Sequence, residues 1–99
     1  MSYKIIWSQE AKYAIIKNID YLSKEWSNQV LNQFLAQVET ALEKIAQNPQ
    51  AYPPHKTATG VRFYKINKRI ILYYRIKDNS EIGLITFWNT YQNPENLKL

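Results

Sequence analysis

Two apolar stripes with helical spacing, joined by almost no intervening chain, most constrain how this 99-residue sequence can fold. Within each stripe the apolar residues recur three or four positions apart, as on one face of a helix. The stripe positions are Ala11, Ile15, Ile19, Leu22, Trp26, Leu31, Leu35, Val38, Leu42 and Ile45. Ser8 can cap the first helix, Ser27 or Asn28 the second, and Pro49 stops the second. So short a connection predicts an antiparallel helical hairpin whose stripes face a common core.

Runs of β-favouring residues lie on both sides of the hairpin. One covers residues 3–7, and three later runs cover residues 61–66, 69–76 and 81–88. The later runs are separated by two and four residues, and links this short join antiparallel neighbours. We therefore expect one α+β domain over residues 1–99, in the order β-α-α-β-β-β, with an antiparallel sheet and the two-helix hairpin packed on one face.

Composition narrows the class of protein. Apolar residues make up 45% of the chain and aromatic residues 14%, which indicates a folded globule. The longest later apolar run, from Ile70 to Tyr74, is far too short for a membrane span, and no export signal precedes the first helix. The absence of cysteine excludes disulfides and suits a reducing compartment. We expect a cytoplasmic protein with no membrane partner.

The residue types of metal and cofactor sites are scarce. The sequence has one histidine, His55, and few carboxylates in its second half, so neither a metal site nor a cofactor is expected. Two glycines do not suffice for a phosphate-binding loop. We interpret His55, which follows two prolines in a loop, as a surface residue.

Positive charge is concentrated in one segment. The net charge is +5, yet residues 51–77 hold seven basic residues and no acid, which leaves six basic and eight acidic residues elsewhere, a net −2. The seven are Lys56, Arg62, Lys65, Lys68, Arg69, Arg75 and Lys77. A segment of one sign favours a polyanionic or acidic partner, although a solvated basic surface explains it as well.

A two-residue turn at Asn67 and Lys68 would fix which side chains share a face, because strand side chains alternate. Arg62 then stands opposite Tyr73. The residues expected to face the helices are Val61, Phe63, Ile70, Leu72, Tyr74 and Ile76, with Lys65 at the rim. Those expected on the open face are Arg62, Tyr64, Arg69, Ile71, Tyr73 and Arg75. A three-residue turn would bring Lys65 to the open face and bury Arg62, which is costly for an arginine without a partner.

An open face of arginine and tyrosine suits phosphates and exposed bases, and it suits an acidic protein surface equally well. Arginine and tyrosine also pair across exposed strands simply to stabilise them. Cleavage of RNA without a metal can be run by lysine, arginine and tyrosine, which can stabilise the phosphorane and move protons. The sequence supplies these residue types, but residue types alone do not distinguish RNA cleavage from binding of a partner or from simple stabilisation of the sheet.

Three segments resemble one known family. "WSQEAKYAIIKNIDYL", "VRFYKINKRIILYYRIKD" and above all "FWNTYQNPENL", in the element order given above, are similar to the RelE/ParE superfamily of toxins from type II toxin–antitoxin modules, also known from plasmid stabilisation. The resemblance covers nearly the whole chain. It implies a toxin that inhibits growth and is neutralised by a cognate antitoxin. RelE-like members cut mRNA on the ribosome, whereas ParE-like members act on DNA gyrase without being nucleases.

The resemblance also implies site residues. The nuclease branch uses basic residues on the second strand, an arginine three residues before the tyrosine of the third strand, and an arginine with a tyrosine near the C-terminus. Lys65 matches the first of these, Ile71 stands at the second, and Tyr91 stands where the late arginine is expected. If the chain cuts RNA, its catalytic residues are expected to be Arg69, Arg75 and Tyr91.

The expected target-binding residues are Arg62, Tyr64, Lys65, Arg69, Tyr73 and Arg75. Because Ile71 and Tyr91 stand at two positions where the nuclease branch has arginine, a ParE-like action on DNA gyrase is favoured. The alternatives are a metal-independent, ribosome-dependent mRNA endoribonuclease and an inactive relative that only binds an antitoxin or nucleic acid.

Overall fold

A computed structural model describes residues 2–25, 27–78 and 80–99. Trp26 of the expected first stripe and Asn79 of the last expected turn lie outside these residues. The elements are β1 (Lys4–Trp7), α1 (Gln9–Glu25), α2 (Asn28–Gln47), β2 (Val61–Lys65), β3 (Ile70–Lys77) and β4 (Glu81–Asn89), with short 3₁₀ turns at Pro49–Ala51 and Pro94–Asn96. The predicted order β-α-α-β-β-β is confirmed.

The sheet has the strand order β1-β4-β3-β2. Strands β2, β3 and β4 form the expected antiparallel meander, but β1 pairs with β4 in parallel, from Lys4 opposite Glu81 to Trp7 opposite Leu84. The α+β class is confirmed, and the sheet is mixed rather than purely antiparallel. Parallel neighbours need a long crossover between them, and the helical hairpin is part of that connection.

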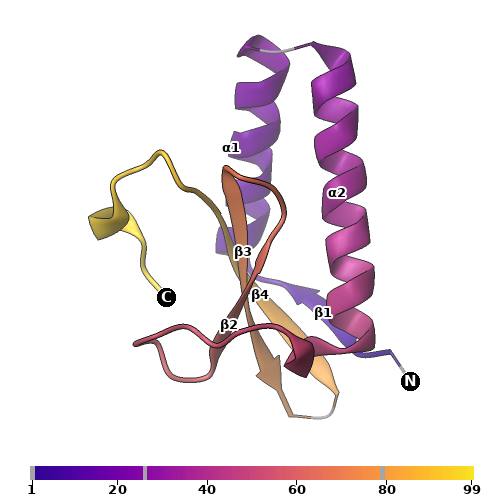
Figure 1. Cartoon of the computed structure of the whole chain (residues 1–99), viewed down its shortest axis with the longest axis vertical. Helices are drawn as coiled ribbons and strands as arrows, with labels where there is room; N and C mark the ends of the chain where they lie inside the picture. The colour runs from indigo at the N-terminus through magenta and orange to yellow at the C-terminus, as the bar shows by residue number, and fades with distance from the viewer. Residues whose placement is uncertain (1, 26, 79) are drawn as a thin grey trace.

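The core lies between the sheet and the helical hairpin, whose two helices stand side by side in Figure 1. Its fully buried side chains include Ile45 of α2, Leu72 and Tyr74 of β3 and Ile82 of β4. On α2 the buried residues are Phe34, Val38, Ala41 and Ile45, spaced four, three and four apart. Leu35 is 40% exposed, so its assignment to the core-facing stripe was wrong, because it lies one position, about 100° of helix turn, away from Phe34.

The turn between β2 and β3 contains three residues, not two. Strand register places Arg62 opposite Tyr74 and Lys65 opposite Ile71, and Ile66 N–H donates to the Ile70 carbonyl at 3.0 Å. The Asn67 side-chain oxygen holds the turn, because it accepts the N–H groups of Arg69 at 2.8 Å and Ile70 at 2.9 Å. The preferred register was therefore wrong by one residue, and each β2 side chain lies on the opposite face from the one expected.

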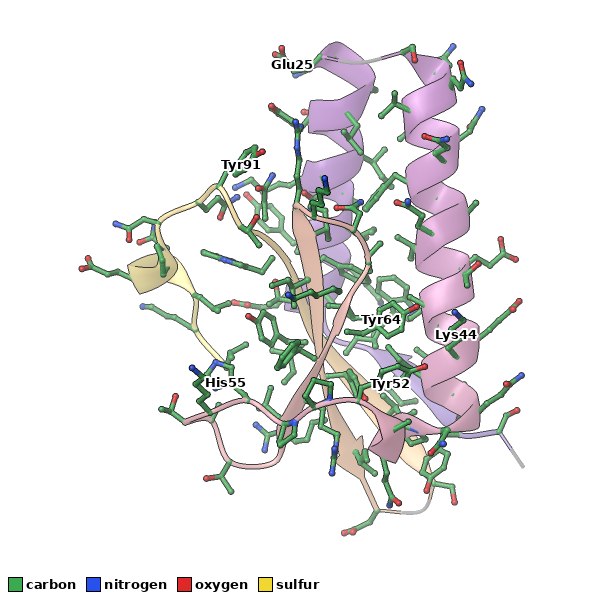
Figure 2. All side chains as sticks on the ribbon, in the orientation of Figure 1. Glu25, Lys44, Tyr52, His55, Tyr64 and Tyr91 are labelled. Carbon is green, nitrogen blue, oxygen red and sulfur yellow. The ribbon has the colours of Figure 1, made fainter. Side chains whose placement is uncertain are left out.

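Arg62 can lie on the helix side of the sheet because its guanidinium has hydrogen-bond acceptors there. Its Nη1 donates to the backbone carbonyl of Tyr52 at 2.6 Å and to that of Gln50 at 3.4 Å. Tyr64 also faces the helices and packs edge-on against Tyr52, with ring centroids 4.9 Å apart, as Figure 2 shows beside α2. The placement of Arg62 and Tyr64 on the open face was wrong.

Asn67→Ala is expected to lower the free energy of unfolding by about 1–2 kcal/mol, because two backbone N–H groups of the turn lose their acceptor. Asn67→Asp keeps the accepting oxygen and serves as the control, with a loss expected to be less than half as large. Urea denaturation measures both variants. An equal loss for the two would contradict the proposed role of the side-chain oxygen.

Tyr74 ties the core to the end of α2. Its side chain is 0% exposed, and its hydroxyl donates to the Pro49 carbonyl at 2.6 Å. Burial raises the pKa of Tyr74 from 10.0 to about 12, and the nearby charge of Arg62 partly opposes this. A raised folded-state pKa stabilises the protein below the unfolded pKa, and the contribution is lost as pH rises through the folded pKa.

Tyr74→Phe is expected to lower the free energy of unfolding by about 1–2 kcal/mol at neutral pH, because the Pro49 carbonyl loses its donor. The advantage of the wild type over the variant should shrink as pH rises from 10 toward 12. Denaturation of both proteins at pH 8 and at about pH 11 measures the difference between them. An unchanged difference would show that Tyr74 does not titrate as its burial requires.

No helix in the part of the chain that the structure describes is long and apolar enough to cross a membrane.

Candidate functional site

The open face of the sheet carries a different set of β2 side chains from the one that the sequence suggested. Lys65, Ile71, Tyr73 and Arg75 lie on it, and Phe63, predicted to face the helices, lies there too. Val61 likewise shares this face with Arg75, its partner in the register, and was also assigned to the wrong face.

Tyr73 points to the predicted face but is only 7% exposed. The rings of His55 and Phe63 cover it, with centroids 5.8 Å and 6.2 Å from its own, and burial raises the pKa of Tyr73 above its ordinary value. A nucleobase cannot stack on the Tyr73 ring while the rings of His55 and Phe63 cover it. Target binding by Tyr73 therefore stays a prediction that would require the loop carrying His55 to move.

His55 organises the loop before β2, and it is half-buried rather than a free surface residue. Its Nδ1 accepts the N–H of Ala58 at 2.9 Å and that of Thr57 at 3.2 Å, while its backbone N–H donates to the Val61 carbonyl at 2.7 Å. Because Nδ1 is the acceptor, the proton of the neutral ring belongs on Nε2. These contacts give His55 a structural role in the loop.

Arg69 and Tyr91 meet at the corner where the β2–β3 turn approaches the end of β4. The Arg69 guanidinium lies 5.0 Å from the centroid of the Tyr91 ring, which is 74% exposed. Thr90 fixes the approach, because its N–H donates to the Arg69 carbonyl at 2.7 Å and its hydroxyl to the Lys68 carbonyl at 3.4 Å. Figure 2 shows Tyr91 at the start of the outward-looping tail.

Two lysines extend this positive corner. Lys65 and Lys68, together with Ile71 and Thr90, line an adjoining hollow of about 470 Å³. We call Lys65, Lys68, Arg69 and Tyr91 the Arg69–Tyr91 corner. It offers three cations and an exposed phenol ring to an anionic or protein ligand. Arginine and lysine are common contacts for phosphate, and arginine and tyrosine are enriched at the hot spots of protein interfaces.

Arg75 does not belong to this corner. It lies six residues after Arg69, along an extended strand, which separates the two residues by about 20 Å. Its side chain is exposed, and Nη1 donates to the Thr59 carbonyl at 3.3 Å. The structure thus brings two of the three expected catalytic residues together and leaves the third at the other end of the strand. Ile71, not a cation, adjoins the corner.

The chemistry that the corner supports is binding rather than proton abstraction. A guanidinium stabilises negative charge but is a poor general base at neutral pH, and a phenol donates a proton more readily than it accepts one. Lys65 and Lys68, which line one hollow, are suited to hold a phosphate or carboxylate there, beside the Arg69–Tyr91 pair.

The sequence reading missed an exposed aromatic surface on α1. Tyr13 is 65% exposed, Ile16 63% and Tyr21 46%. Tyr13 and Tyr21 line a groove of about 740 Å³ that continues to Trp88 and Tyr91. The sequence could have indicated this surface, because Tyr13, Ile16 and Tyr21 lie off the apolar stripe of α1 and are therefore not expected in the core.

Comparison with known families matches most of the chain. The family model described as "ParE toxin of type II toxin-antitoxin system, parDE" matches residues 5–94. No curated protein sequence matches the chain.

Several solved structures share the fold. The chromosomal ParDE system from P. aeruginosa superposes with a TM-score of 0.73 at 12% identity, covering 89% of this chain and 96% of that one. The toxin–antitoxin complex RelBE2 from Mycobacterium tuberculosis gives 0.65 at 17% identity, covering 90% and 99%. The DinJ–YafQ toxin–antitoxin complex from E. coli gives 0.62 at 12% identity, covering 92% and 96%. At such identities the likeness concerns the fold alone.

Proposed function

The chain belongs to the ParE toxin family of type II toxin–antitoxin systems, within the RelE/ParE superfamily, and from this premise we propose that it inhibits growth by binding DNA gyrase without cutting nucleic acid. The observation that carries the proposal is the separation of the expected catalytic residues. Arg69 and Tyr91 are in contact, whereas Arg75 lies about 20 Å away along β3. Residues so far apart cannot act on one scissile phosphate, which needs its acid, base and charge-stabilising groups within hydrogen-bond reach.

The Arg69–Tyr91 corner is the surface that we propose for the target. Tyr91 is 74% exposed, and Arg69 lies against its ring, so the pair presents a large apolar face with a positive edge. Arginine and tyrosine are enriched in the hot spots of protein interfaces, and tyrosine buries much area at little cost in side-chain freedom. Lys65 and Lys68 add positive charge that speeds association with an acidic surface.

Ribosome-dependent cleavage of mRNA is the second candidate, and one observation favours it. Lys65, Lys68 and Arg69 lie around the same corner as the exposed phenol of Tyr91. Three cations can stabilise a phosphorane, and the phenol can protonate the leaving oxygen. This arrangement would need a general base from outside the corner, for which the ribosome is a source.

Induction of the protein in growing cells separates the two functions. We expect DNA breaks that disappear in a strain with a toxin-resistant gyrase, and intact mRNA. New mRNA 5′ ends in phase with codons, without DNA breaks, would overturn the gyrase proposal and support cleavage on the ribosome. Normal growth at confirmed expression would overturn both and favour an inactive relative.

We further propose a cognate antitoxin as the natural partner. The solved relatives include ParDE and RelBE2 systems, which contain an antitoxin with the toxin. The exposed Tyr13, Ile16 and Tyr21 give this chain an apolar surface that a protein partner can cover. Co-expression with the product of an adjacent small acidic reading frame should restore growth and yield a stable complex. Growth that stays blocked with every neighbouring product would contradict the proposal.

A further inference from the structure

A second positively charged site lies on the open face, at the end of the sheet away from the Arg69–Tyr91 corner. Arg75, Lys77 and Lys98 line a hollow of about 430 Å³, together with Ile85 and Gly83. Arg75 and Lys77 come from β3, and Lys98 comes from the tail, which Figure 1 shows turning back toward the strands. Segments far apart in the sequence thus bring three cations to one place.

Gly83 forms part of the floor of this hollow, which we call the Gly83 hollow. It stands opposite Arg75 in the β3–β4 register, and a Cβ on Gly83 would lie 2.7 Å from Cε and 3.5 Å from Nζ of Lys77. The Lys77 side chain therefore lies across the space that a larger residue would fill. Because Gly83 has no side chain, the Lys77 ammonium group can lie close to the sheet, next to the position where Arg75 pairs with Gly83.

None of the three cations is paired with a carboxylate in the residues that the structure describes. Arg75 donates to the Thr59 carbonyl at 3.3 Å, but neither it nor Lys77 or Lys98 forms a salt bridge there. Glu10 also lines the hollow, without pairing to any of the three. Three positive charges around one concave space repel one another unless an anion or solvent compensates them.

We propose that the Gly83 hollow binds a phosphate ester, either as a small phosphorylated molecule or as one phosphate of a nucleic-acid backbone. Its volume is in the range of small-molecule sites, and arginine with lysine is the usual donor set for phosphate. The floor at Gly83 and the walls of Ile6 and Ile85 are apolar, which suits the sugar attached to a phosphate rather than the bare ion alone. This site is independent of the gyrase proposal, because it lies at the other end of β3.

Nuclear magnetic resonance titration of the full chain tests the site with two probes, inorganic phosphate and a short single-stranded oligothymidylate. We expect saturable shifts of the Gly83 amide with at least one probe. The variant Arg75→Ala/Lys77→Ala/Lys98→Ala should weaken that binding about tenfold or more. Gly83→Ala retains all charges but displaces Lys77, and should weaken binding severalfold. Saturation by phosphate alone indicates a small ligand.

A tighter response to the oligonucleotide indicates a nucleic-acid backbone. In that case the slope of log K against log salt should fall by about 2 in the triple variant, from about 0.7 for each lost contact. The matched control is Lys12→Ala/Lys24→Ala/Lys44→Ala, which removes three exposed charges from the helices. The proposal is overturned if Gly83 does not respond to either probe, or if the control weakens binding as much as the triple variant. Amide dispersion in the same spectra shows that each variant is folded.

Discussion

The double variant Arg69→Ala/Tyr91→Ala is expected to abolish growth inhibition on induction while the protein remains folded. Both side chains are at the surface corner, where the Arg69 guanidinium lies 5.0 Å from the Tyr91 ring centroid. Exposed cation–π pairs contribute only about 0.5–1 kcal/mol to stability, so the fold should tolerate their loss. Hot-spot residues at an interface cost about 2 kcal/mol or more each, which is a loss of target affinity of about a thousandfold for the pair.

Lys17→Ala/Tyr13→Ala is the matched control for this experiment. It removes the same kind of pair on α1, where the Lys17 ammonium lies 5.5 Å from the Tyr13 ring centroid. Plating efficiency on inducer measures both variants, with circular dichroism to verify folding. Full toxicity of the Arg69 and Tyr91 variant, or equal loss of toxicity in the control, would contradict the assignment of the target surface to the corner.

Arg62→Ala is expected to lower the free energy of unfolding by about 2–3 kcal/mol. The reason is that the guanidinium donates to the Tyr52 carbonyl at 2.6 Å on the helix side of β2, and its removal leaves that carbonyl without its charged donor. Arg75→Ala, which removes an exposed arginine from the neighbouring strand, should change stability by less than about 0.5 kcal/mol. Chemical denaturation distinguishes the two. Equal effects would favour the register in which Arg62 faces solvent.

The helices and strands could be predicted because their signals are local. The stripe from Ala11 and the stop at Pro49 are patterns of neighbouring residues, and the structure reproduces them to within one or two positions. The register between β2 and β3 could not be predicted from such patterns. It depends on the side chain of Asn67, which accepts two N–H groups, and on Tyr52, which supplies a carbonyl to Arg62 across a loop.

The sequence proposes individual residues for the candidate site but not their arrangement. Arg69 and Tyr91 were each expected to matter, and their contact depends on Thr90, whose N–H bonds to the Arg69 carbonyl at 2.7 Å. The burial of Tyr73 could not be predicted, because it depends on a loop that carries His55 over the sheet. The separation of Arg75 from the corner follows simply from strand geometry once both residues are assigned to the β3 region.

A supercoiling assay with purified DNA gyrase tests whether the chain acts on gyrase through the Arg69–Tyr91 corner. The wild-type protein is expected to inhibit gyrase or to trap its cleaved complex on DNA, and Arg69→Ala/Tyr91→Ala is expected to leave gyrase active at the same concentration. Purified wild-type protein that leaves supercoiling unchanged at every concentration, while still cutting mRNA on programmed ribosomes, would contradict the gyrase proposal.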